Sequence, residues 1–101
     1  MSHQSSAPLA RDGHDLIIVE LSDELLIYDR SNYKAHCLNI TASLIWKNCN
    51  GRSTVADMAH RLSMDQEVIV YCINQLGKRR LLRSKPDYPK ISRRDLIRVV
   101  A

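Results

Sequence analysis

The first third of the chain holds three short apolar runs that polar residues separate. The runs at 16–21 and 25–28 are rich in aliphatic and β-branched residues, which suits half-buried strands. Residues 22–24 form the first polar break, and the turn-forming side chains of residues 29–32 form the second. A third strand is predicted over 33–38. Short connections between successive strands indicate an antiparallel meander, and such a sheet needs a layer that covers its apolar face.

The middle of the chain changes to helical periodicity and predicts three helices. Two residues compete to cap each helix: Asn39 or Thr41 for the first, Ser53 or Thr54 for the second, and Ser63 or Asp65 for the third. Apolar positions recur at helical spacing in the second and third helices: Val55, Met58, Ala59 and Leu62, then Val68, Ile69, Cys72, Ile73 and Leu76. Trp46 of the first helix is expected in the core, which Leu81 and Leu82 close.

This order of elements predicts an α+β fold, a three-stranded antiparallel sheet followed by three helices, with a winged helix-turn-helix-like layout. A length of 101 residues corresponds to one domain. We expect a flexible N-terminal tail over 1–14 and a folded domain over 15–84. A basic C-terminal tail over 85–101 would follow, in which Ser92 can cap a short helix.

Composition narrows the class of protein. With 45% hydrophobic and 26% charged residues, and only three Gly and three Pro, the chain has the profile of an ordinary folded protein. No apolar run approaches the roughly 18 residues that a membrane span needs, and the N-terminus lacks the apolar stretch of a signal peptide. We therefore predict a cytoplasmic protein without a membrane partner.

The chemistry-bearing residues form no familiar catalytic or metal-binding pattern. Cys37, Cys49 and Cys72 include no CxxC pair, and the four histidines show no zinc spacing. The chain contains no Gly-rich phosphate loop, no GxSxG and no HExxH. Neither an enzyme, a metal site nor a cofactor is expected.

Charge is distributed unevenly along the chain, although the total is only +4. Residues 1–77 hold six Lys/Arg and nine Asp/Glu, a net charge of −3, whereas residues 78–101 hold nine Lys/Arg and two Asp/Glu, a net charge of +7. Such a localised positive surface can attract nucleic acid, an anionic membrane or an acidic peptide. Net charge alone does not choose among them.

Three segments carry a resemblance to a known family. They are ELLIYDRSNYKAHCLN (24–39), TASLIWKNCNGRSTVADMAHRL (41–62) and VIVYCINQLGKRRLL (68–82). Together they resemble the PqqD family, small peptide-chaperone domains also called RiPP recognition elements. One departure concerns the end of the third helix, where the family often has Gly before two closing leucines and this chain has Arg80.

The resemblance implies a non-catalytic module that binds the leader of a ribosomally made precursor peptide by strand addition. It would present that leader to a separate modifying enzyme, such as a radical SAM enzyme, in PQQ biosynthesis or another RiPP pathway. A homodimer is left open. Carried over from the family, the leader-binding positions are Lys34, Ala35, His36, Cys37 and Leu38 on the third strand, and Val68, Tyr71, Cys72, Gln75 and Arg79 on the third helix.

Several of these residues also have a purely structural interpretation. For Leu38, Cys72 and Val68 a place in the hydrophobic core is favoured over a place in the pocket, and Tyr71 fits either a cover for the sheet or an anchor for a peptide. Lys34 on an edge strand would guard against unwanted pairing. The cationic run Lys78, Arg79, Arg80 and Arg83 would attract acidic leader residues or simply be solvated at a helix end.

A winged helix DNA-binding protein is the alternative, because the second and third helices can be aligned with a helix-turn-helix. The supposed recognition helix begins with Met64, Asp65, Gln66 and Glu67. Two acidic residues at that position would repel phosphate, so nucleic acid is not the expected partner.

Overall fold

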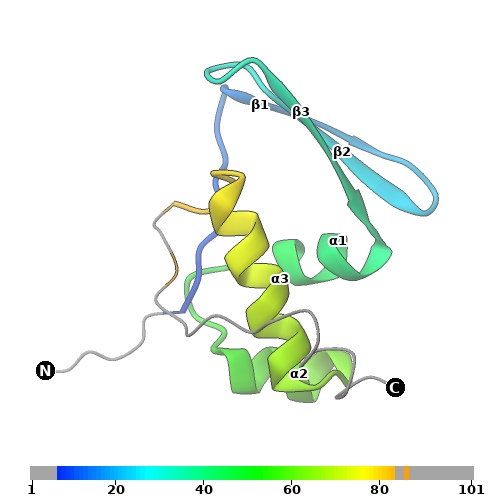
Figure 1. Cartoon of the computed structure of the whole chain (residues 1–101), viewed down its shortest axis with the longest axis vertical. Coiled ribbons are helices and arrows are strands. Elements are labelled where there is room, and N and C mark those ends of the chain that lie inside the picture. Colours follow the sequence, from blue (N-terminus) through cyan, green and yellow to red (C-terminus); the bar gives the residue numbers. More distant parts are fainter. Residues whose placement is uncertain (1–6, 84–85, 87–101) are drawn as a thin grey trace, which may run out of the picture.

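The computed structural model, which describes residues 7–83 and Pro86, contains a three-stranded antiparallel sheet followed by three helices. The predicted α+β class is therefore confirmed, while the winged-helix comparison stays a prediction. Figure 1 shows the sheet extending from one end of the helical layer. The strands lie in the order β1-β2-β3, and the elements are β1 (Leu16–Glu20), β2 (Glu24–Asp29), β3 (Lys34–Asn39), α1 (Ile40–Lys47), α2 (Val55–Leu62) and α3 (Gln66–Lys78).

The sheet buries one face and exposes the other, as alternation along β2 predicts. Leu25 and Ile27 of β2 are buried, and the register places them opposite Leu38 and His36 of β3, which are buried too. β1 differs, because Leu16 is its only buried residue. The core therefore lies mainly under β2 and β3, and β1 adds Leu16 alone.

Cap geometry decides between the competing helix starts. The Asn39 side chain accepts a hydrogen bond from the Ala42 N–H at 2.8 Å and begins α1. Thr54 and Asp57 form a reciprocal capping box at the start of α2. Asp65 occupies the N-cap of α3 without a side-chain cap bond.

The end of α3 shows how the helix is capped at Arg80, where the pattern that the chain resembles often has Gly. The Leu81 N–H donates to the Leu76 carbonyl and the Arg80 N–H donates to the Gly77 carbonyl, both at 3.0 Å. These two bonds form a Schellman motif, which requires a left-handed residue between helix and exit. Arg80 adopts that conformation with φ of 60°. The family's glycine position is thus filled here by a side chain, in a conformation that disfavours one.

Trp46 joins the helical layer to the chain that follows α3. Its side chain is buried, and its indole N–H donates to the Leu81 carbonyl at 2.8 Å. Leu81 and Leu82 are buried in the same core. The predicted core role of these three residues is confirmed.

Residues 8–12 require a correction to the expected N-terminal tail. Leu9 and Ala10 form isolated backbone bridges with Asn50 and Leu82, and the Arg11 N–H donates to the Leu81 carbonyl at 2.9 Å. The segment is extended and bonds to loops, so it shows neither of the periodicities from which elements are predicted. The folded unit therefore begins before residue 15. The predicted C-terminal tail and its short helix lie outside the described residues, except for Pro86.

Candidate functional site

Among the described residues β3 is an edge strand of the sheet, and its only strand partner there is β2. The pattern of its bonds follows from the β1–β2 turn, where the Leu21 N–H donates to the Glu24 carbonyl at 2.9 Å. Bonded and non-bonded pairs alternate along an antiparallel ladder. Even-numbered residues of β2 therefore bond to β1, and odd-numbered residues of β2 bond to β3.

The same alternation shows which amides of β3 remain at its open edge. Ile27 of β2 is registered with His36, so the backbone of His36 is directed toward β2. Ala35 and Cys37 lie on either side of His36, and their N–H and C=O groups are consequently directed away from the sheet. An additional strand at this edge would find these groups available.

A pocket of about 210 Å³ lies beside the second half of this edge, and we call it the apolar pocket. It is smaller than the roughly 300–1,000 Å³ typical of sites for drug-sized ligands, and a single side chain would fit it. Three elements supply its walls: Cys37, Leu38 and Asn39 from β3, Thr41 and Ala42 from α1, and Tyr71, Cys72, Gln75, Leu76 and Arg79 from the region of α3.

A second pocket of about 360 Å³, which we call the basic pocket, lies toward the first half of β3. Arg79 lines both pockets, so the two are neighbours along β3, and we call the pair the groove. The residues of the basic pocket are Asn32, Lys34, His36, Lys78, Arg79 and Arg80.

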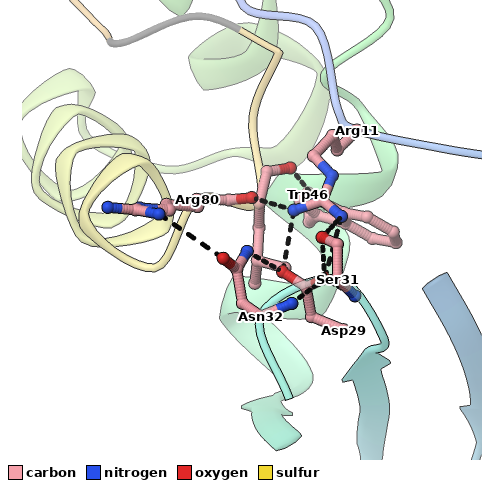
Figure 2. A network of polar contacts seen from close by, with 7 residues as sticks. Arg11, Asp29, Ser31, Asn32, Trp46 and Arg80 are labelled. Carbon is pink, nitrogen blue, oxygen red and sulfur yellow. Dashed lines mark hydrogen bonds and ion pairs between the residues drawn. The ribbon is translucent and has the colours of Figure 1, made fainter. Parts of the chain in front are cut away.

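A partly buried ion pair is hydrogen-bonded to a residue that lines the basic pocket. Arg11 donates to both carboxylate oxygens of Asp29, at 2.8 and 2.9 Å, and Asp29 is fully buried. Ser31 and Asn32 donate to the same carboxylate, and Arg80 donates to the Asn32 amide oxygen at 3.4 Å. Figure 2 shows this network joining the N-terminal segment, the β2–β3 turn and the end of α3.

The network also fixes the ionisation of Asp29. The hydrogen bond from Arg11 is the largest influence and holds the pKa of Asp29 well below its usual range, against the opposing effect of burial. The side chains of Asn32 and Ser31 lower it further. Asp29 is therefore a carboxylate at all ordinary pH values, already matched by Arg11.

His36 is a residue of β3, and it lines the basic pocket together with the cationic side chains. It is only 9% exposed, and its Nε2 atom has no hydrogen-bond partner among the described residues. Burial is the main cause that lowers the pKa of His36, and the charges of Arg79, Lys34 and Arg11 add to the effect, whereas Asp29 opposes it. The imidazole is consequently neutral at pH 7.

Each of the three thiols has a pKa above its usual value. A hydrogen bond with the Glu24 carboxylate raises the pKa of exposed Cys37. Burial raises the pKa of Cys49 to about 12 and also raises the pKa of Cys72. Within residues 7–83, no three His, Cys, Asp or Glu side chains gather in a group that could hold a metal ion.

The structure gathers most of the family-derived positions at the groove. The apolar pocket collects Cys37, Leu38, Tyr71, Cys72, Gln75 and Arg79, and the basic pocket collects Lys34, His36 and Arg79. Ala35 is exposed and contributes its backbone to the open edge, and half-buried Val68 lines neither pocket. Leu38 is also part of the core, at 2% exposure.

Sequence reasoning missed several walls of the groove. Asn32 was visible only as a turn former, and Asn39 and Thr41 only as helix caps. Ala42 and Leu76 carried no signal beyond their apolar spacing. Arg83, which belongs to the same cationic run as Arg79, instead pairs with Asp12 at 2.7 Å.

The chain matches no protein-family profile, no curated protein and no solved structure. The resemblance to the PqqD family therefore rests on the residues of the three quoted segments. Within the part of the chain that the structure describes, no helix has both the length and the apolar character to cross a bilayer.

Proposed function

We propose that this protein is a non-catalytic, cytoplasmic peptide-binding module of the PqqD type. It binds the leader of a ribosomally made precursor peptide and presents it to a separate modifying enzyme. The observation that carries the proposal is the open edge of β3 beside a pocket large enough for one side chain. An extended peptide gains affinity from main-chain pairing at such an edge and selectivity from the pocket beside it.

The arrangement around β3 suits presentation of a peptide better than chemistry on it. The described thiols are protonated, and His36 lies covered in the wall of the groove. A bound leader would raise the effective concentration of its precursor at a partner enzyme, for which moderate affinity suffices because the product must leave. In this proposal the enzyme supplies the reaction and this chain supplies the substrate.

DNA binding is less well supported by the same surfaces. Asp65, Gln66 and Glu67 are exposed at the start of α3, where a recognition helix would meet the groove of DNA. Lys78 and Arg79 lie at the opposite end of that helix. The acidic start of α3 would therefore meet the DNA phosphates first, and the repulsion between these like charges opposes association.

An NMR titration of the labelled full chain tests the proposal. The probes are a peptide selected against the immobilised protein from a random library and a mixed-sequence DNA duplex. We expect the peptide to shift the amides of Ala35 and Cys37 and those of Tyr71 to Arg79, and β1 to remain unchanged. Salt-sensitive shifts with DNA alone, or peptide shifts confined to β1 and α2, would contradict it.

A further inference from the structure

The basic pocket holds positive charge that the described part of the chain does not neutralise. Within residues 7–83 the ion pairs are Arg11 with Asp29, Lys47 with Glu20, and Arg83 with Asp12. None of these carboxylates is paired with the cations of the basic pocket, which are Lys34, Lys78, Arg79 and Arg80. Like charges gathered in one concave site repel one another and create a strong field for an anion.

One wall of the site, formed by Asn32 and Arg80, is held by hydrogen bonds before any ligand arrives. Asp29 anchors the side chain of Asn32 at 2.6 Å, and Asn32 accepts from Arg80. Behind them lies His36, which is more than nine-tenths buried and has an Nε2 atom without a hydrogen-bond partner among described residues. A donor that is already fixed, such as Arg80, loses little freedom on binding, so its contacts contribute more to affinity.

The position of this pocket along β3 places it within reach of a side chain of a peptide bound at that strand. Both pockets are lined by residues of β3 and of the α3 region, so side chains of an added strand that face α3 enter them. Side chains on one face of a strand recur every second residue, at roughly 3.3 Å per residue. The basic pocket adjoins Lys34 and His36, and the apolar pocket adjoins residues 37–39.

We propose that the groove selects peptides in which an Asp or Glu lies about two or four residues from an apolar side chain. The carboxylate enters the basic pocket and contacts Lys34 and Arg79, while the apolar side chain enters the apolar pocket. This inference rests on the proposed function and deepens it by naming the class of leader. A carboxylate on a peptide fits better than the phosphates of DNA, because the cations lie beside an open strand edge and next to the apolar pocket.

Selection from a random peptide library tests the spacing directly. Peptides of about 12 residues span the groove in extended form. The full chain is compared with the double variant Lys34→Gln/Arg79→Gln and with the matched control Lys47→Gln/Arg52→Gln. Both variants remove two positive charges, but the control alters exposed residues outside the two pockets.

We expect the wild type and the control to enrich the same acidic and apolar pair, and the groove variant to lose the acidic preference. Replacing the selected Asp by Asn in the peptide should weaken binding to the wild type about tenfold, and binding to the groove variant hardly at all. Inorganic phosphate serves as a competitor. Millimolar phosphate should weaken the Asp-containing peptide until its affinity equals that of the Asn-containing peptide. This result would support the binding of an anion in the basic pocket.

The contrary outcomes separate this inference from the proposed function. Peptides that bind along β3 with no acidic preference, or that bind the groove variant as tightly as the wild type, would overturn the inference alone. Failure to enrich any peptide would overturn both. A DNA duplex that shifts Lys34 and Arg79 more strongly than every selected peptide would assign the pocket to phosphate instead.

Discussion

The two edges of the sheet share one backbone geometry but have different surroundings. β3 has α1 at its end and the groove between its open edge and α3. β1 buries only Leu16, and its neighbours Ile17, Ile18 and Val19 are 44–47% exposed. An open edge therefore does not make a binding site by itself. What distinguishes β3 is the set of side chains placed next to its free amides.

The support beneath the two edges differs as well, and this difference gives the largest expected effect. Asp29 is fully buried and accepts from Arg11, whereas Glu20 of β1 pairs with Lys47 at 3.0 Å in solvent. Asp29→Asn removes one member of a buried pair and should lower the free energy of unfolding by about 3 kcal/mol. Glu20→Gln should change it by less than about 0.5 kcal/mol. Urea unfolding monitored by circular dichroism measures both.

Acid should reproduce the loss at Asp29 without a mutation. Its pKa in the folded state lies well below the unfolded value of about 3.9, so the stabilisation is complete above that value. The stabilisation by Asp29 declines as the pH falls below about 3.9. A wild-type protein whose stability falls no faster in acid than that of Asp29→Asn would contradict the role of this pair.

Proline substitutions compare the two open edges directly. Cys37→Pro removes an outward N–H from β3, and Ile18→Pro removes one from β1, where even-numbered residues face away from β2. Both side chains are exposed. We expect peptide affinity to fall by about thirtyfold or more for the β3 variant and to stay unchanged for the β1 variant. Equal losses, measured by calorimetry, would argue against β3 as the docking edge.

Glycine substitutions separate stability from recognition. Arg80 and Ser63 both have positive φ, 60° and 55°, and only Arg80 lines the groove. Replacing either by Gly should raise the free energy of unfolding by about 1 kcal/mol, because Gly adopts this conformation without strain. Only Arg80→Gly should also weaken the binding of acidic peptides. If Ser63→Gly weakened the binding of acidic peptides as much as Arg80→Gly does, the loss would come from the change at a helix end and not from the Arg80 side chain.

The smallest expected effect is the titration of His36. Its lowered pKa means that the unfolded chain binds the proton more readily, so stability is complete above pH 6.5, approximately, and falls as the pH drops. The loss should be small at pH 5.5 and absent in His36→Gln. Denaturant midpoints at the two pH values measure it. An acidic peptide in the basic pocket should raise the pKa of His36, which NMR detects.

Much of the fold could be predicted from the sequence because apolar periodicity reports burial. The helical spacing of Val55, Met58 and Leu62 indicates α2, and the short apolar run that contains Leu25 and Ile27 indicates β2. Choosing Thr54 over Ser53 as a cap needed geometry, since both residue types cap helices. The sequence could not show that residues 8–12 join the domain, because their bonds go to distant loops.

The candidate site was predicted less completely, for a physical reason. Cys37 and Tyr71 were indicated by the family resemblance, and the structure places both beside the apolar pocket. Asn32 and Thr41 were not, because a turn and a helix start already accounted for them locally. Arg80 and Arg83 are close in sequence, yet one lines the groove and the other pairs with Asp12. Sequence proximity therefore said little about which cations gather.

The bond between Trp46 and Leu81 gives the protein an optical reporter of its own. Trp46 is the only tryptophan in the chain, and its indole bonds to the carbonyl of the residue that follows Arg80. Indole emission depends on the surroundings of the ring and on its hydrogen bond. Fluorescence of the unlabelled protein would therefore follow any movement of the α3 terminus, and with it the arrival of a ligand between that terminus and β3.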